Sequence, residues 1–427
     1  MKGWLTVTGW QGLVASGGYL TGTIIQSLIV LTVLSYAASE TSWQDTLLYW
    51  AAIFLAGFIN TVVSSLLPKL KGLILVLHIL GFFSILIPLV ILAPHDSAKD
   101  VTGWLNEGNW SSQGLSFFVG LIGNFFAFLG ADGAFHMSEE IRNPSLVVPR
   151  SIILSIILNG SMGLAMIIPI LFCLGDIDAA LSTNTGYPFI EIFFHATRSV
   201  SGSTTMASLV VYALLLTVSL RHPVCFGRLL EIMVYLAGEL FQRWVCKSPY
   251  TLDPTNCSWT TTNLTLTRRT TIPLWSIAIT CVVSCLLALI NIGSATDFND
   301  VVSLSVAGLY SSYLICALLL LYRRLTGRFQ KLTDISDGPT LVNTTGAQLV
   351  WGPWHVPGVF GTINSTFASL YLTTILFFSF WPFTSPVTAA NMNYSSLVTG
   401  AVMIFSVIYY IILGRHEWNG PVIEIHL

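Results

Sequence analysis

Residues 114–140 read GLSFFVGLIGNFFAFLGADGAFHMSEE and contain the feature that decides the fold. The stretch is apolar enough to enter a membrane, yet Gly130, Asp132 and Gly133 stand together near its centre. Glycine weakens a helix by about 1 kcal/mol relative to alanine, and a mid-membrane aspartate costs about 2.5–3.5 kcal/mol on insertion scales. Both are tolerated where broken backbone lines a polar cavity. The pattern therefore predicts an interrupted spanning helix with a binding site. The alternative is close helix packing at the glycines, with Asp132 near the inner interface.

The rest of the chain has the composition of a membrane protein. Of its 427 residues, 54% are hydrophobic and 9% are charged. Soluble domains carry about 25% charged residues, so this chain cannot build a water-facing surface. A transmembrane β-barrel would alternate apolar and polar residues over about ten positions, and the long apolar runs exclude that architecture.

Ten apolar stretches are long enough to cross a bilayer, which takes about 20 residues of helix. They cover roughly 8–36, 46–67, 72–93, 115–136, 151–174, 204–220, 273–292, 301–322, 363–383 and 397–414. So many apolar helices leave no amphipathic shell to cover them, which excludes a soluble protein with buried helices. We therefore predict an all-α membrane protein in which residues 1–427 form a single transmembrane domain.

Lysine and arginine residues set the orientation of these spans. With the N-terminus inside, 16 of the 18 fall in inner loops, and only Lys99 and Arg198 fall outside. The positive-inside rule therefore places both termini in the cytoplasm. The loop 94–114 is then outside and carries the glycosylation sequon Asn109-Trp110-Ser111.

Several chemistries find no support in the sequence. The seven cysteines show no metal-ligand spacing, and there is no glycine motif of a nucleotide-binding P-loop. A membrane-embedded enzyme would need a nucleophile–base pair or a metal set at one depth, and we find neither. We expect no enzyme activity, no cofactor, no metal and no nucleic-acid partner.

Several segments resemble one transporter superfamily. FAFLGADGAFHMSEEIRNPSLVVPRSI (126–152) resembles the sixth helix and following loop of the amino acid–polyamine–organocation superfamily. WLTVTGWQGLVASGGYLTGTIIQ (4–26) resembles its third helix, and LPKLKGLILVLHILGFF (67–83) its fifth. ALINIGSATDFNDVVSLSVAGLYSSYL (288–314) resembles its ninth and tenth. WGPWHVPGVFGTINSTFASLYLTTILFFSFWP (351–382) resembles its eleventh. The resemblance is closest to the fungal amino acid/choline permeases, which include 4-aminobutyrate permeases.

This resemblance implies secondary active transport of an amino acid, 4-aminobutyrate or a choline-like amine by proton-coupled alternating access. The partners would be that small molecule, a proton and the lipid bilayer. The expected location is the plasma membrane, with the vacuolar membrane as the alternative. A nutrient receptor that binds its ligand without net transport is the other function that the sequence leaves open.

The resemblance also assigns roles to residues of the sixth-helix pattern. The expected substrate-binding residues are Phe126, Ala127, Leu129, Gly130, Ala131 and Asp132. Phe126 would be an aromatic gate, with ordinary packing as its alternative. Asp132 stands at the place of an acidic residue that is linked in some members to gating or protonation. His78 is a second candidate for a proton relay, because histidine exchanges a proton near neutral pH; a packed, hydrogen-bonded histidine is the alternative.

The chain departs from the family pattern at two places. Family members have twelve helices, of which ten form two inverted repeats, and the match assigns the first span here to the third helix. This implies an inverted-repeat fold with an incomplete first repeat. Because the family's first helix holds the substrate carboxylate, we expect weakened transport or an inactive permease fragment. The pattern is also lost at Arg221 and regained near Ile272, so 221–272 is expected to be an atypical cytoplasmic loop.

Overall fold

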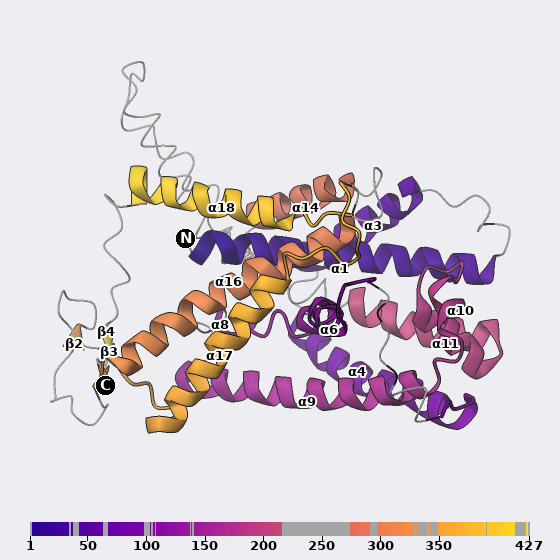
Figure 1. The fold of residues 1–427 in the computed structure, drawn as a ribbon, viewed down its shortest axis with the longest axis horizontal. Helices are drawn as coiled ribbons and strands as arrows, with labels where there is room; N and C mark the ends of the chain where they lie inside the picture. Colours follow the sequence, from indigo (N-terminus) through magenta and orange to yellow (C-terminus); the bar gives the residue numbers. More distant parts are fainter. Residues whose placement is uncertain are drawn as a thin grey trace, which may run out of the picture.

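The computed structural model is almost entirely helical (Figure 1). It describes residues 2–33, 36, 42–62, 67–97, 103, 106, 108–136, 138, 141–215, 274–290, 297–327, 329–330, 340–341, 349–389, 391–414 and 424–425. The expected inner loop 221–272 lies outside these ranges. Within them, strands are limited to β1 (Phe329–Gln330), β2 (Thr340–Leu341), β3 (Leu349–Val350) and β4 (Glu424–Ile425). β1 pairs with β3 in parallel, and β2 pairs with β4 in antiparallel.

Seven helices in the described part of the chain are long and apolar enough to cross a membrane. They are α1 (Lys2–Thr32), α3 (Ser42–Val62), α4 (Leu67–Leu92), α9 (Pro144–Phe172), α16 (Asp297–Leu325), α17 (Gly358–Phe378) and α18 (Ser395–Tyr409). The last continues as the π-helix η5 (Tyr410–Gly414). Shorter apolar helical stretches cover Gln113–Ala127, Val200–Leu215 and Ile277–Ala288. The all-α membrane architecture expected from composition is confirmed.

Two helices begin well before the stretches that apolar composition marks. α1 starts at Lys2 rather than near residue 8, and α9 starts at Pro144 rather than near residue 151. Proline is favourable in the first turn of a helix, and Pro144 occupies that turn directly after the cap residue Asn143. Apolar composition marks the part of a helix that meets lipid, whereas helical hydrogen bonding continues into the interface. A span predicted from apolar composition therefore begins several residues after the first residue of the helix.

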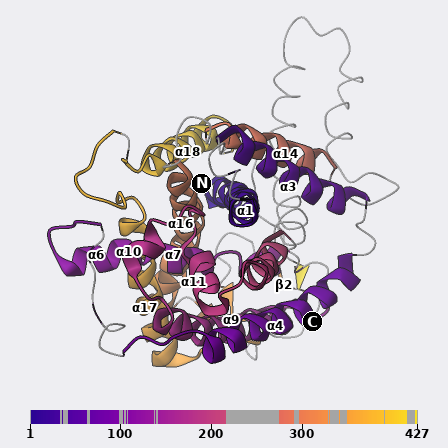
Figure 2. The same cartoon turned by 90° about the vertical axis from the view of Figure 1, so that its right-hand side faces the viewer.

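α1 runs through the middle of the molecule, and Figure 2 views it nearly end-on among the other helices. α1 and α16 approach each other closely at two glycines, Gly9 and Gly308. A Cβ atom added to Gly308 would lie 2.7 Å from the Gly9 nitrogen and 2.9 Å from the Leu5 carbonyl oxygen. Small residues allow such backbone contact, which is a principal means by which spanning helices associate. The pair Gly9–Gly308 therefore sets the distance between α1 and α16.

Side-chain hydrogen bonds join α1 and α3 to α14 (Leu274–Ala288). The Gln11 amide donates to the Ser284 hydroxyl at 2.8 Å, and the Tyr49 hydroxyl donates to the Ser284 carbonyl at 3.0 Å. The Trp50 indole donates to the Cys285 carbonyl at 3.2 Å. Interhelical bonds of this kind contribute about 0.6 kcal/mol each in a membrane, and here they hold three helices in register.

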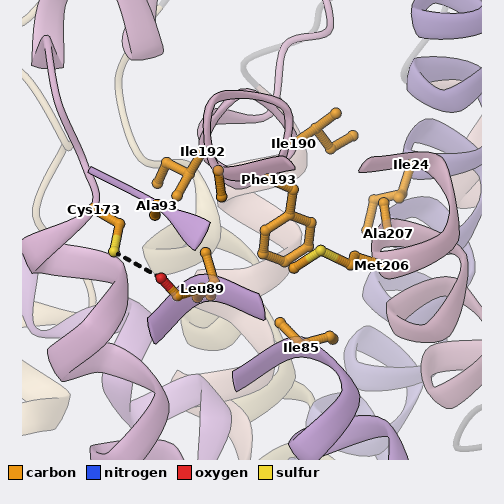
Figure 3. Packing of buried hydrophobic residues seen from close by; sticks show 11 residues of the cluster. Ile24, Ile85, Leu89, Ala93, Cys173, Ile190, Ile192, Phe193, Met206 and Ala207 are labelled. Atoms are coloured by element: carbon orange, nitrogen blue, oxygen red, sulfur yellow. Dashed lines mark hydrogen bonds between the residues drawn. The ribbon is translucent and has the colours of Figure 1, made fainter. Parts of the chain in front are cut away.

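A second group of elements packs around the short helix α11 (Pro188–Thr197). Figure 3 shows the apolar cluster where α11 meets α1, α4, the end of α9 and the helix Val200–Leu215. With ten residues, α11 is too short to cross a bilayer. It lies at the end of the molecule where α1 and α9 finish (Figure 1). The buried members of this cluster are Ile24, Ile85, Leu89, Ala93, Cys173, Ile190, Ile192, Phe193, Ala196, Met206 and Ala207.

Arg324, in the last turn of α16, fixes the segment that leads into α17. Its guanidinium donates two hydrogen bonds of 3.1 Å to the Val356 carbonyl and lies 4.5 Å from the ring centroid of Trp351. Phe329 and His355 stack on the same indole, with centroid distances of 3.9 and 4.9 Å. A planar cation suits both contacts, because guanidinium can direct two N–H groups at one oxygen and can stack on aromatic faces.

Candidate functional site

The fourth apolar stretch is an interrupted helix. It consists of α6 (Gln113–Gly120), α7 (Ile122–Ala127) and α8 (Gly133–His136), and a non-helical turn covers residues 128–132. Gly130 has a φ of 84°, in the region that costs an L-residue roughly 1–2 kcal/mol. The turn is closed by short-range bonds: Leu129 N–H donates to the Phe126 carbonyl at 3.1 Å, and Gly133 N–H donates to the Gly130 carbonyl at 3.2 Å. Glycine at position 130 therefore makes the break possible.

Asp132 lies at the end of this turn, half-buried between α1 and α16. The Trp10 indole of α1 donates to its Oδ2 atom at 3.3 Å. The buried phenol of Tyr313, on α16, interacts with the same carboxylate electrostatically. Both groups are neutral, so they stabilise a carboxylate without cancelling its charge. The end of the broken helix thus places a carboxylate beside the side chains of Trp10 and Tyr313.

A second tyrosine of α16 supports the helix just before the break. The Tyr310 hydroxyl donates to the Phe125 carbonyl at 3.0 Å. The Phe125 ring meets the rings of Tyr310 and Tyr371 edge-on, with centroid distances of 6.4 and 5.7 Å. Edge-to-face pairs contribute about 0.5–1.5 kcal/mol each beyond their burial. These contacts hold the end of α7 against α16 and α17.

The residues expected to bind substrate lie at the end of α7 and in the turn that follows it, and their side chains differ in surroundings. Leu129 is buried in the apolar cluster that contains Trp10 and Leu13, and Phe126 packs at the edge of that cluster. Ala127 is exposed, whereas Gly130, Ala131 and Asp132 are half-buried. The turn therefore presents its backbone and Asp132, while Leu129 anchors it to the core.

His78, the other candidate for a proton relay, is exposed on α4. Among the described residues, the side chains of Trp10 and Tyr313 are two that interact with Asp132. In the ranges that the structure describes, no group of three or more histidine, cysteine, aspartate or glutamate residues could hold a metal ion. The described part of the site brings together one carboxylate, one broken helix and aromatic side chains.

Three of these side chains were not predicted from the sequence: Trp10, Tyr310 and Tyr313. A signal for the tyrosines exists, because positions 310 and 313 are three residues apart and so lie on one face of a helix. Two phenols on one face of an otherwise apolar span need polar partners, and the interrupted helix supplies them. Trp10 carries no comparable signal, since indoles are common near the ends of spans.

Comparison with known proteins identifies the family of this chain. Residues 1–404 match the family model for amino acid permeases. The chain is similar to an amino acid/polyamine transporter of Macrophomina phaseolina (26% identity, covering 92% of this chain and 79% of that protein). It is also similar to the choline transporter of Saccharomyces cerevisiae (26% identity, covering 83% of this chain and 56% of that protein). A third relative is amino-acid permease 2 of Neurospora crassa (24% identity, covering 99% of this chain and 70% of that protein).

The chain thus spans little more than half of the choline transporter and over two thirds of the other two relatives. The family match covers most of the apolar helices, including the interrupted one. The protein is an integral multi-pass membrane transporter and not an enzyme. It belongs to the amino acid permease family.

Proposed function

We propose that this permease moves an amino acid, 4-aminobutyrate or a choline-like amine across the membrane by alternating access. The names of its relatives support this substrate class, because they include an amino acid/polyamine transporter, a choline transporter and an amino-acid permease. Each of these substrates carries a positively charged nitrogen. A site for them therefore needs groups that favour a cation in a membrane.

The observation that carries the proposal is the break at Gly130 beside Asp132. Carbonyl groups at the end of a helix favour cations, and discontinuous helices use them to bind substrates near the bilayer midplane. The run α6–α7 ends at Ala127, and the Asp132 carboxylate lies five residues further on. The substrate amine would bind between this helix end and Asp132, with Phe126 beside it.

Coupling to a proton is proposed to act through Asp132. Carboxylates inside spanning segments commonly serve as proton relays in pumps and transporters. An ammonium group bound beside Asp132 would favour the charged form, so substrate and proton would compete for one site. The exposed His78 is the weaker candidate for this role.

The orientation proposed for this transporter has both termini in the cytoplasm, from the distribution of lysine and arginine. The segments that follow α4 and α9 would then face outward. The plasma membrane is the proposed location, with the vacuolar membrane as the alternative.

Uptake of radiolabelled 4-aminobutyrate, amino acids and choline into permease-deficient cells tests this proposal. Gly130→Ala should reduce uptake because alanine strains the turn by about 1–2 kcal/mol. Gly123→Ala is the matched control: Gly123 lies in α7, and an added Cβ there would meet no atom within 4 Å. Binding without accumulation would indicate a receptor. Equal uptake by both variants would remove the turn from the mechanism.

A further inference from the structure

Two cysteines stand one turn apart on α14. Cys281 and Cys285 lie four positions apart, which places them on the same face of the helix with Cβ atoms about 5–6 Å apart. Both are free thiols and half-buried, and they interact electrostatically with each other. The other cysteines in the described ranges lie on different elements: Cys173 directly follows α9, and Cys316 is exposed on α16. α14 therefore carries a pair of neighbouring thiols.

The face that carries this pair is turned toward α3. A Cβ atom added to Gly57, on α3, would lie 3.2 Å from the Cys281 Sγ atom. One turn further along α14, the Trp50 indole donates to the Cys285 carbonyl at 3.2 Å, and Tyr49 interacts electrostatically with the Cys285 thiol. Both cysteines pack against the apolar cluster that contains Tyr49. The two sulfur atoms thus lie at the contact between α3 and α14.

These surroundings decide which kind of ligand the pair can take. Among the described residues, no third histidine, cysteine, aspartate or glutamate joins them in a group that could hold a metal ion. Soft thiolates bind soft cations such as Cu(I), but two thiolates around one monovalent cation keep a negative charge, and burying a charge in apolar surroundings is costly. Trivalent arsenic forms covalent bonds to both sulfurs and gives a neutral product. The apolar contact therefore favours a trivalent arsenical.

We propose that Cys281 and Cys285 form a dithiol site for trivalent arsenicals, which bridge the two sulfur atoms. In the reaction with phenylarsine oxide, each thiol loses its proton as an As–S bond forms. The oxygen leaves arsenic with both protons as water, and arsenic stays trivalent, so no oxidant or reductant takes part. The neighbouring side chains Val282 and Leu286 are both 59% exposed, so an uncharged, apolar reagent reaches the thiols through the lipid.

The bridge spans the turn of α14 that is bonded to two other helices. Ser284 lies between the two cysteines in the sequence, and it accepts hydrogen bonds from Gln11 of α1 and Tyr49 of α3. Drawing the two sulfur atoms together changes the packing of this turn. The resulting inhibition of uptake rests on the proposed function. Formation of the bridge does not, because it can be measured without substrate.

The test is the protection of each thiol from alkylation. Membranes that contain the full chain would be treated with phenylarsine oxide, washed, and denatured in SDS so that burial no longer protects any thiol. Light N-ethylmaleimide then marks the thiols without arsenic. A dithiol reagent removes the arsenic, and heavy N-ethylmaleimide marks the thiols that are released. By peptide mass spectrometry, Cys281 and Cys285 should be protected together, and Cys173 and Cys316 should not be protected.

Serine substitutions test whether both thiols are needed. Two linked binding groups exceed the affinity of one by about 10²- to 10⁴-fold. Cys281→Ser and Cys285→Ser should therefore each raise the phenylarsine oxide concentration that half-protects the remaining thiol by at least about 100-fold. Cys316→Ser is the matched control and should leave that concentration unchanged. Absence of protection in wild type would overturn the dithiol site, and so would undiminished protection of one thiol after the other is replaced.

Gly57→Ala tests the position of the bridge. Its Cβ atom would press on the Cys281 Sγ atom from 3.2 Å, so half-protection should need more phenylarsine oxide. Gly81→Ala, on α4, is the control, because its Cβ atom would meet no atom within 4 Å. Equal protection in these two variants would contradict a bridge at the contact between α3 and α14.

Uptake into permease-deficient cells tests the effect of the bridge on transport. Phenylarsine oxide should inhibit uptake by wild type at the concentration that protects both thiols, and it should not inhibit Cys281→Ser or Cys285→Ser at that concentration. Protection without inhibition would refute the effect on transport. Absence of uptake by untreated wild type would refute the proposed function instead, and the protection assay would still decide whether the dithiol site exists.

Discussion

The contact between Gly9 and Gly308 makes a quantitative prediction for Gly308→Ala. The added Cβ would lie 2.7 Å from the Gly9 nitrogen and 2.8 Å from the Gly9 Cα, where ordinary contact begins near 3.4 Å. Both obstructing atoms are backbone, so α1 and α16 must move apart by several tenths of an ångström. Overpacking of this kind typically costs about 1–3 kcal/mol. Trp10 is adjacent to Gly9, and its 3.3 Å bond to Asp132 has little room to lengthen.

The assay is thermal stability of the purified protein, followed by the loss of monodisperse protein on heating in detergent. Gly308→Ala should have a lower melting temperature than wild type and should also lose uptake. Gly163→Ala is the control, because it lies in α9 with no atom within 4 Å of an added Cβ. Alanine there should be neutral or stabilising by up to about 1 kcal/mol. If Gly308→Ala and wild type have the same melting temperature, the close approach of α1 and α16 is wrong.

Three further predictions concern other parts of the molecule. Trp10→Phe should reduce uptake because it removes the indole N–H that contacts Asp132. Trp43→Phe, at a 54% exposed position of α3, should not reduce it. Equal uptake by the two variants would show that the indole hydrogen bond plays no part in transport. Asn109 is exposed in the loop 94–114, which the proposed orientation places outside the cell. Asn109→Gln should therefore abolish a glycosidase-sensitive gel shift. A cytoplasmic position of Asn109 would mean that the opposite orientation is correct. Arg324→Lys should lower the melting temperature, because lysine cannot make both bonds to Val356; full stability would show that the paired bonds are dispensable.

The interrupted helix could be predicted from the sequence because its cause is local. Gly130 and Asp132 are unfavourable in a continuous spanning helix, whatever surrounds them. The partners of Asp132 could not be predicted in the same way. Trp10 lies 122 positions away and Tyr313 lies 181 positions away, and only the packing of α1 against α16 brings them to the carboxylate.

The short helix α11 shows a different limit. A search for stretches of about 20 apolar residues passes over a ten-residue helix, and residues 175–203 are predicted only as a connection between the spans 151–174 and 204–220. The apolar residues Ile190, Phe193 and Ala196 nevertheless recur every three residues, which is the spacing of a buried helix face. The start of α9 was also predicted too late, because its first two turns contain Pro144, Pro149 and Arg150 and so stand outside the apolar stretch.

The most direct test of the proposed mechanism is proton-driven accumulation in proteoliposomes that contain the purified chain. With an inward proton gradient, we predict saturable accumulation of a labelled amino acid or amine above its external concentration. Asp132→Asn should abolish the dependence on the gradient, because an amide cannot exchange the proton, while the protein remains folded and inserted. Accumulation that is equally strong and equally gradient-dependent in Asp132→Asn would contradict a transport site at the broken helix.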